Sequence, residues 1–145
     1  MSTHIIERRP GRDGATRLLE AVALPASDLT DSHMNEFFYC GSAAAPVGLV
    51  GLEFLGNDVL LRSLAVAPDR RGSGLGSALA DMAEAHARAR GARSIFLLTT
   101  TAEAFFKSRG YVPADRATAP DAIRTSREFA DLCPASSAFL VKHLL

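Results

Sequence analysis

Residues 64–79 read LAVAPDRRGSGLGSAL and carry the most informative pattern in the chain. The first residues of this stretch end an apolar strand, and Pro68 interrupts that strand. Three alternating glycines, at positions 72, 74 and 76, then lead directly into a helical pattern. Glycine permits positive φ and close approach of a ligand, and the first turn of a helix offers unpaired N–H groups at the positive end of its dipole. The stretch therefore predicts an anion site, best suited to phosphate, with Arg70 and Arg71 beside it.

Two common phosphate-binding loops do not fit this stretch. The dinucleotide fingerprint needs its glycines after a first strand, with a two-residue gap before the third glycine. A P-loop needs Gly-Lys-Ser/Thr, whereas this chain has Gly76-Ser77-Ala78. The ligand is therefore expected to be a phosphate compound of another kind.

The segments around the loop predict a mixed sheet. Residues 36–40, 47–55 and 59–66 are strand-like and joined by short loops, which indicates an antiparallel meander. A helix then carries Leu75, Leu79, Met82 and His86 on one face and ends near Gly91, before a fully apolar strand at residues 95–98. Because a helix separates them, strands 59–66 and 95–98 should run parallel.

The flanks add short elements to this centre. We expect strands at residues 4–8, from Tyr111 and at 137–143, and helices from Asp13, at 28–33, at 102–108 and at 121–131. The prediction is a single α/β domain over residues 1–145, with a mixed, mostly antiparallel sheet of six or seven strands and helices on both faces.

Composition narrows the classes of function. Lys plus Arg equals Asp plus Glu, at 16 each, which argues against broad nucleic-acid binding. No run of about 18 apolar residues and no signal core is seen, so no membrane partner and a cytoplasmic location are expected. Cys40 and Cys133 lack close spacing, and the histidines form no ligand pair with them, so no metal is expected.

The spacing of Arg71, Gly74 and Gly76 resembles the coenzyme A signature of the GNAT superfamily of acetyltransferases. In that signature an Arg or Gln is followed by two residues, Gly, one residue, and Gly or Ala. Residues 102–111, AEAFFKSRGY, resemble the superfamily's second block, a short helix before a Gly-aromatic pair. Residues 61–66, 97–101, 105–106 and 132–136 are further similar to acetyltransferases found with arsenic-resistance genes.

The resemblance implies a GNAT fold in which acetyl-CoA, the cosubstrate, lies where two parallel strands splay apart. The acetyl group would pass directly to a small-molecule primary amine, an amino-acid-like amine being one candidate, and the protein could form a homodimer. The backbone N–H of Leu64 would stabilise the oxyanion. The implied cofactor-binding residues are Leu64, Ala65, Val66, Arg71, Gly72, Ser73, Gly74, Leu75, Gly76, Ser77 and Phe106.

The resemblance leaves the proton-transfer groups open. Many relatives carry an acidic base on the fourth strand, where this chain has Leu60 and Leu61. Glu53 on the preceding strand is the nearest candidate; the alternative is an exposed strand carboxylate. The usual tyrosine acid is replaced by Phe106, so the acid is absent, is water, or is one of three hydroxyl residues. Those residues are Thr99, Thr101 and Tyr111.

Arg62 is a charged residue in a predicted central strand. One interpretation makes it the anchor for the carboxylate of an amino-acid-like acceptor, with Ser63 beside it in the acceptor site. The alternative is an internal pair with Glu53 across the hairpin. Cys133, Pro134, Ser136 and Ser137 are weaker candidates for the acceptor side.

Two other functions stay open at this point. Phe106 and the acid-free fourth strand also fit a catalytically weak acyl-CoA-binding or sensing module. A protein acetyltransferase comes last, because the chain lacks net acidic charge and a docking extension.

Overall fold

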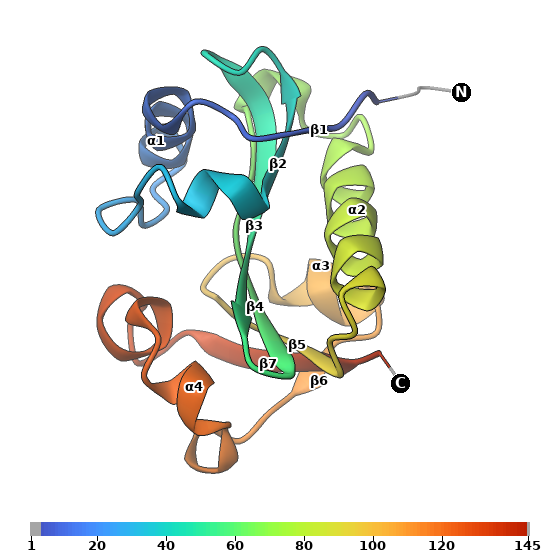
Figure 1. The fold of residues 1–145 in the computed structure, drawn as a ribbon. Coiled ribbons are helices and arrows are strands. Elements are labelled where there is room, and N and C mark those ends of the chain that lie inside the picture. Colours follow the sequence, from blue (N-terminus) through green and yellow to red (C-terminus); the bar gives the residue numbers. More distant parts are fainter. Residues whose placement is uncertain (1–3, 145) are drawn as a thin grey trace.

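The computed structural model describes residues 4–144. Its centre is a seven-stranded sheet with the order β1-β2-β3-β4-β5-β7-β6 (Figure 1). The strands are β1 (Glu7–Arg8), β2 (Phe37–Gly41), β3 (Pro46–Leu55), β4 (Asp58–Val66), β5 (Ser94–Thr99), β6 (Val112–Pro113) and β7 (Ala138–His143). All neighbours are antiparallel except β4 and β5, which run parallel. The predicted parallel pair and mixed sheet are confirmed.

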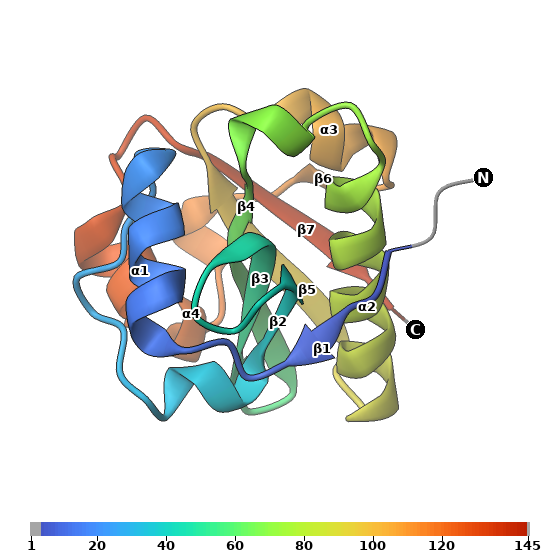
Figure 2. The same cartoon turned by 90° about the horizontal axis from the view of Figure 1, so that it is seen from above.

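Helices cover both faces of the sheet (Figures 1 and 2). α2 (Leu75–Ala89) and α3 (Glu103–Ser108) lie on one face, while α1 (Arg12–Ala21) and α4 (Asp121–Arg124) lie on the other. Short turns of helix connect them: η1 (His33–Glu36), η2 (Pro68–Arg70), η3 (Arg116–Thr118) and the π-type η4 (Glu128–Leu132). Across the described residues, no helix is long and apolar enough to cross a bilayer.

The buried stripe of α2 differs from the predicted one at its C-terminal end. Leu75 and Leu79 are buried as expected, but Ala83 and Ala87 continue the stripe. His86 is half-buried and meets the rings of Phe38 and Phe54 edge-on. Small alanine side chains let the helix axis approach the sheet closely. Because alanine is only weakly hydrophobic, these positions do not stand out in the periodicity of the sequence.

Two predicted helices differ from the structure: one is absent and the other is interrupted. The helix expected at residues 28–33 is absent; turns occupy much of this segment, and a 3₁₀ turn begins only at His33. The helix expected at residues 121–131 is interrupted: α4 ends at Arg124 and a separate π-type turn begins at Glu128. Asp28 and Glu128 are instead held by Arg62, so tertiary charge pairing determines the backbone there.

Two features of β4 shape the centre of the molecule. Its pairing with β5 ends at Leu60 and Phe96, beyond which the two strands separate. Against β3, Leu49 pairs with Ala65 and Gly51 with Arg62, so Val50 lies opposite two residues, Ser63 and Leu64. This is a β-bulge, and Ser63 takes φ +61°, a left-handed conformation that is costly for a serine.

Candidate functional site

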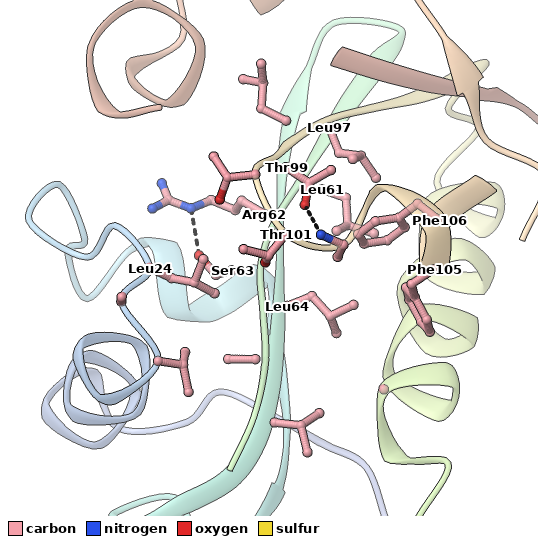
Figure 3. A pocket seen from close by; sticks show the side chains of 18 of the residues that line it. Leu24, Leu61, Arg62, Ser63, Leu64, Leu97, Thr99, Thr101, Phe105 and Phe106 are labelled. Carbon is pink, nitrogen blue, oxygen red and sulfur yellow. Dashed lines mark hydrogen bonds between the residues drawn. The ribbon is translucent and has the colours of Figure 1, made fainter. Parts of the chain in front are cut away.

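A cavity of about 990 Å³ opens where β4 and β5 separate (Figure 3). One wall comes from β4, the glycine loop and α3; the other comes from residues 22–27 and the segment around η4. Leu61 to Val66 and Leu97 to Thr101 run along it from the two strands. The predicted gap between the parallel strands is thus a real cavity, large enough for an extended cofactor and a small second molecule.

The glycine loop forms one end of this cavity. Gly74 is the N-cap of α2, has φ +85° and provides no side-chain cap for the first-turn N–H groups. A Cβ at Gly74 would meet only His4 at 4.0 Å, and one at Gly76 would meet Phe105 and Val66 at 3.9 Å. Both Phe105 and Val66 line the cavity. Internal packing therefore leaves space at these glycines, and an uncapped helix N-terminus of this kind suits an anion.

The predicted cofactor residues gather at this end with one exception. Leu64, Ala65, Val66, Arg71, Gly72, Gly74, Leu75, Gly76, Ser77 and Phe106 line the cavity. Ser73 does not; its hydroxyl donates to the carbonyl of Arg70, and its own carbonyl lies 3.0 Å from Nε2 of His4. Ser73 therefore stiffens the loop from outside the cavity.

The three candidates for the general acid lie in different places relative to the cavity. Thr99 and Thr101 line the cavity, and the Thr99 hydroxyl accepts a 2.9 Å hydrogen bond from the N–H of Ala102 (Figure 3). Tyr111 is not among the described residues that line it. Its hydroxyl donates to Glu84 on α2, and burial beside that carboxylate raises the tyrosine pKa. Tyr111 therefore belongs to the core behind α3.

Phe106 is buried and lies at the cavity wall. Only 3% of the residue is exposed, and its ring packs edge-on against Phe105 and Tyr111. The ring therefore packs in the core on one side and lines the cavity on the other. Many GNAT relatives have a tyrosine at this position.

Arg62 is the centre of a buried ion-pair cluster. Its guanidinium has no exposed surface and contacts three carboxylates from separate parts of the chain. Nη1 and Nη2 donate to Asp28 at 2.6 and 2.9 Å, Nη1 donates to Glu53 at 3.1 Å, and Nη2 lies 3.0 Å from Glu128. The internal pair with Glu53 is present, and the guanidinium offers no free surface to an acceptor carboxylate.

Ser63 and Glu53 take different places around Arg62. The Ser63 hydroxyl accepts a 3.0 Å hydrogen bond from Nε of Arg62, and Ser63 lines the cavity (Figure 3). Glu53 is largely covered and is not among the described residues on the cavity wall. Its ion pair with Arg62 and its absence from the described cavity lining do not favour the role of base.

Asp28, His33 and Glu53 also bring possible metal ligands within 4.8 Å of one another. Arg62 accounts for this arrangement, because both carboxylates already bind its guanidinium. Nδ1 of His33 accepts from the N–H of Thr30 at 3.0 Å. A cation here would have to displace the guanidinium.

Sequence reasoning missed Glu128, which lies on the cavity wall. Its Oε2 accepts a 3.0 Å hydrogen bond from the thiol of Cys133, which also lines the cavity. Burial raises the pKa of Glu128 above its usual range, and burial beside Glu128 raises the pKa of the Cys133 thiol to about 12. The thiol therefore stays protonated at neutral pH and is a poor nucleophile. Glu128 lies far from the glycine loop in sequence, with no motif to mark it.

Comparison with known proteins identifies the family. The family model described as acetyltransferase (GNAT) family matches residues 8–111, most of the chain. The chain belongs to the acetyltransferase (GNAT) family. The match spans the glycine loop, both diverging strands and the second block, and it ends before Glu128.

Curated relatives of this GNAT chain share a short region with it. An amino-acid acetyltransferase of Azotobacter vinelandii is 44% identical over 54 residues, which is 37% of this chain and 12% of that protein. One from Ralstonia nicotianae is 49% identical over 51 residues, 35% of this chain and 11% of that protein. The aligned region is thus about a tenth of these relatives' length.

Solved structures agree on the GNAT fold. N-acetylglutamate synthase from Neisseria gonorrhoeae, complexed with coenzyme A and L-arginine, gives a TM-score of 0.80 at 21% identity, covering 99% of this chain and 34% of that one. Rv2747 from Mycobacterium tuberculosis, in complex with CoA, gives 0.78 at 22% identity, covering 97% and 99%. At these identities the likeness concerns the fold.

Proposed function

We propose that this GNAT protein transfers the acetyl group of acetyl-CoA to the nitrogen of a small-molecule primary amine. The observation that carries the proposal is the cavity between β4 and β5, which ends at the uncapped N-terminus of α2. The pyrophosphate of acetyl-CoA would bind the amides from Arg71 to Ser77, since free N–H groups and a helix dipole favour an anion there. Membership of the GNAT family supports the same ligand.

The bulge in β4 supports a role for Leu64 in the chemistry. A bulge leaves one backbone unit outside the regular ladder, and this one falls at Ser63 and Leu64 on the cavity wall. In the proposed complex the Leu64 N–H donates to the thioester carbonyl, whose oxygen gains negative charge as the amine attacks. Thr99 is the hydroxyl proposed to assist departure of the thiolate, directly or through water.

The transfer is proposed to be direct. Cys133 lines the cavity, but its raised thiol pKa disfavours an acetyl-cysteine intermediate. A direct attack needs both substrates in one cavity, and holding them in line can itself lower the barrier by several kcal/mol.

An amino-acid-like amine is one candidate acceptor, and the names of the curated relatives favour it. The closed ion pairs of Arg62 count against this chain using Arg62 as the carboxylate anchor. A role in arsenic resistance, a cytoplasmic location and a homodimer are narrower parts of the proposal that rest on the sequence.

The test is release of free coenzyme A, followed with a thiol-reactive dye, over a panel of primary amines and free amino acids. We expect amine-dependent release, with the acetylated amine found by mass spectrometry. Tight binding of acetyl-CoA with no acetylated product from any amine, or from a metabolite extract, would support the alternative of a sensing module.

A further inference from the structure

We infer that Glu128 receives the acceptor's ammonium group and removes its proton, and that the acceptor site selects cationic amines. The inference rests on the proposed function and deepens it. Glu128 begins η4, is 6% exposed, and is the only carboxylate among the described residues that line the cavity. Asp28 and Glu53 bind the same guanidinium from outside the wall.

The charge count around Arg62 is the first argument. One guanidinium faces three carboxylates, so the ionised cluster carries two excess negative charges, and it is buried. Buried charge is costly unless it is paired. The other cationic side chains on the cavity wall, Arg70 and Arg71, lie at the anion site. An ammonium that arrives beside Glu128 would supply the missing positive charge.

A hydroxyl on the cavity wall that has no hydrogen-bond partner gives the second argument. Ser137 lines the same cavity and is 5% exposed, and its hydroxyl has no hydrogen-bond partner among the described residues. Buried hydroxyl groups nearly always have partners in folded proteins. A bound acceptor with a polar group beside its nitrogen would give this hydroxyl one.

The surroundings of Glu128 suit a base. Burial raises its pKa, the charge of Arg62 and the Cys133 hydrogen bond oppose the rise, and Asp28 and Glu53 add to it. Arg116 and His33 are the next charged or titratable groups, facing Cys133 and Asp28. A carboxylate with a raised pKa accepts a proton from an ammonium, whose pKa is about 10, more readily than an exposed one does.

The proposed transfer passes through one tetrahedral adduct. The Glu128 carboxylate takes one proton from R–NH₃⁺, and the nitrogen lone pair of R–NH₂ attacks the acetyl carbonyl carbon. The tetrahedral adduct collapses, the C–S bond breaks with its electron pair on sulfur, and the second proton leaves nitrogen for the thiolate. The products are R–NH–CO–CH₃ and coenzyme A, and Glu128 returns its proton to solvent.

The pH dependence of Glu128→Gln tests the inference. The wild type uses the ammonium form, so kcat/KM should rise through the Glu128 pKa and level off above it. The variant can use only the free amine, which is about one part in 10³ at neutral pH for a pKa of about 10, so its kcat/KM should be about 10³-fold lower there. It should then rise about tenfold per pH unit toward the amine pKa and approach the wild-type value. A lost structural contact would not be rescued by raising the pH.

Asp28→Asn is the matched control, because it removes a carboxylate partner of the same guanidinium from outside the cavity wall. It should lower the melting temperature and keep the rise and plateau of the wild-type pH profile, with the rise moved to lower pH because the Asp28 charge raises the Glu128 pKa. An unchanged profile in Glu128→Gln, or the altered profile appearing in Glu53→Gln instead, would overturn the inference alone. A wild type that acetylates no amine would overturn the proposed function with it.

Selection for cationic amines has its own test. The wild type should prefer primary amines without a carboxylate over amines that carry an α-carboxylate, by kcat/KM, which would set aside the amino-acid-like candidate acceptor. The preference should shrink in Glu128→Gln, because the negative charge that repels the carboxylate is reduced. Equal preference in both proteins would contradict the assignment of the acceptor site.

Discussion

In the proposed complex, Gly74 is the residue on which cofactor binding depends most directly. It has φ +85° and open space beside it, so a side chain there would project beside the free amides of α2. Gly74→Glu should abolish coenzyme A binding in isothermal titration calorimetry, because the carboxylate occupies the anion site and repels phosphate.

Gly56 provides a matched control. It lies in the turn between β3 and β4, has φ +72°, and has nothing within 4 Å of an added Cβ. Gly56→Glu therefore adds the same backbone strain and the same charge away from the cavity. Coenzyme A affinity should fall only in Gly74→Glu. Equal losses of affinity in the two variants would contradict the proposal that the glycine loop binds the pyrophosphate.

Phe106 tests whether a general acid is missing. If its ring edge faces the sulfur, Phe106→Tyr should leave turnover unchanged or raise it, since general-acid catalysis is worth about 10²-fold or more. If the hydroxyl is buried without a partner, stability should fall by about 1–3 kcal/mol with no gain in rate. Steady-state rates and thermal melts on Phe106→Tyr and Phe106→Leu distinguish the two. A destabilised, slower Phe106→Tyr contradicts our expectation.

Arg62 should matter more for folding than its position in one strand suggests. Arg62→Leu leaves three buried carboxylates without a counter-charge, and losing one partner of a buried ion pair costs about 3–5 kcal/mol. Arg62 holds the pKa of Asp28 below its usual range. The pairing therefore stabilises the wild type at pH values above that range, and this stabilisation is lost in acid, when Asp28 is protonated. The variant's deficit should therefore shrink as pH falls below about 4, the ordinary range of an aspartate, where the wild type loses this pairing. Urea unfolding at neutral pH and at about pH 3 measures this, and a deficit independent of pH would count against it.

These residues show what could be predicted from the sequence. The glycine loop and the Arg62–Glu53 pair are local: the first is a motif, and the second joins neighbouring strands of one hairpin. Asp28 and Glu128 approach Arg62 only through the tertiary fold, and neither lies in a recognisable motif. The full charge cluster beside the proposed acceptor site therefore could not be predicted from the sequence, because nothing in the sequence links Asp28 and Glu128 to Arg62.

At the scale of elements, the central strands and α2 were predictable because their apolar patterns are long and their turns short. The errors fall at residues 28–33 and 121–131, where short polar segments are held by contacts with Arg62 and the core rather than by their own periodicity. The bulge in β4 also escaped prediction, since Ser63 gives no glycine to mark its positive φ.

The free edge of β4 leads to a prediction about dynamics. Beyond Leu60 this strand has lost β5 as a partner, so its backbone faces the cavity. Coenzyme A should pair with that edge and slow hydrogen exchange in a peptide covering residues 61–67. The turn at residues 56–58 lies outside the cavity and is the internal control. Equal change in both peptides would indicate general stabilisation in place of pairing along β4.

At the scale of the whole molecule, cofactor binding should stabilise the fold by linkage. Acetyl-CoA at 100 times its dissociation constant adds about 2.7 kcal/mol, which for a domain of this size raises the melting temperature by several degrees. A thermal-shift titration measures this, with Gly74→Glu as the negative control. A melting temperature that does not change with acetyl-CoA concentration would contradict binding of acetyl-CoA to the folded state.

The two walls of the cavity come from separable stretches of the chain. The wall that we propose binds the cofactor is built mainly by residues 64–106, whereas the wall that we propose binds the acceptor comes from residues 22–27 and 128–137, on either side of it in sequence. A lineage could therefore exchange one wall without disturbing the other. Transplanting the two flanking stretches from a relative with another acceptor should be a direct route to re-engineering, with coenzyme A affinity inherited from the recipient.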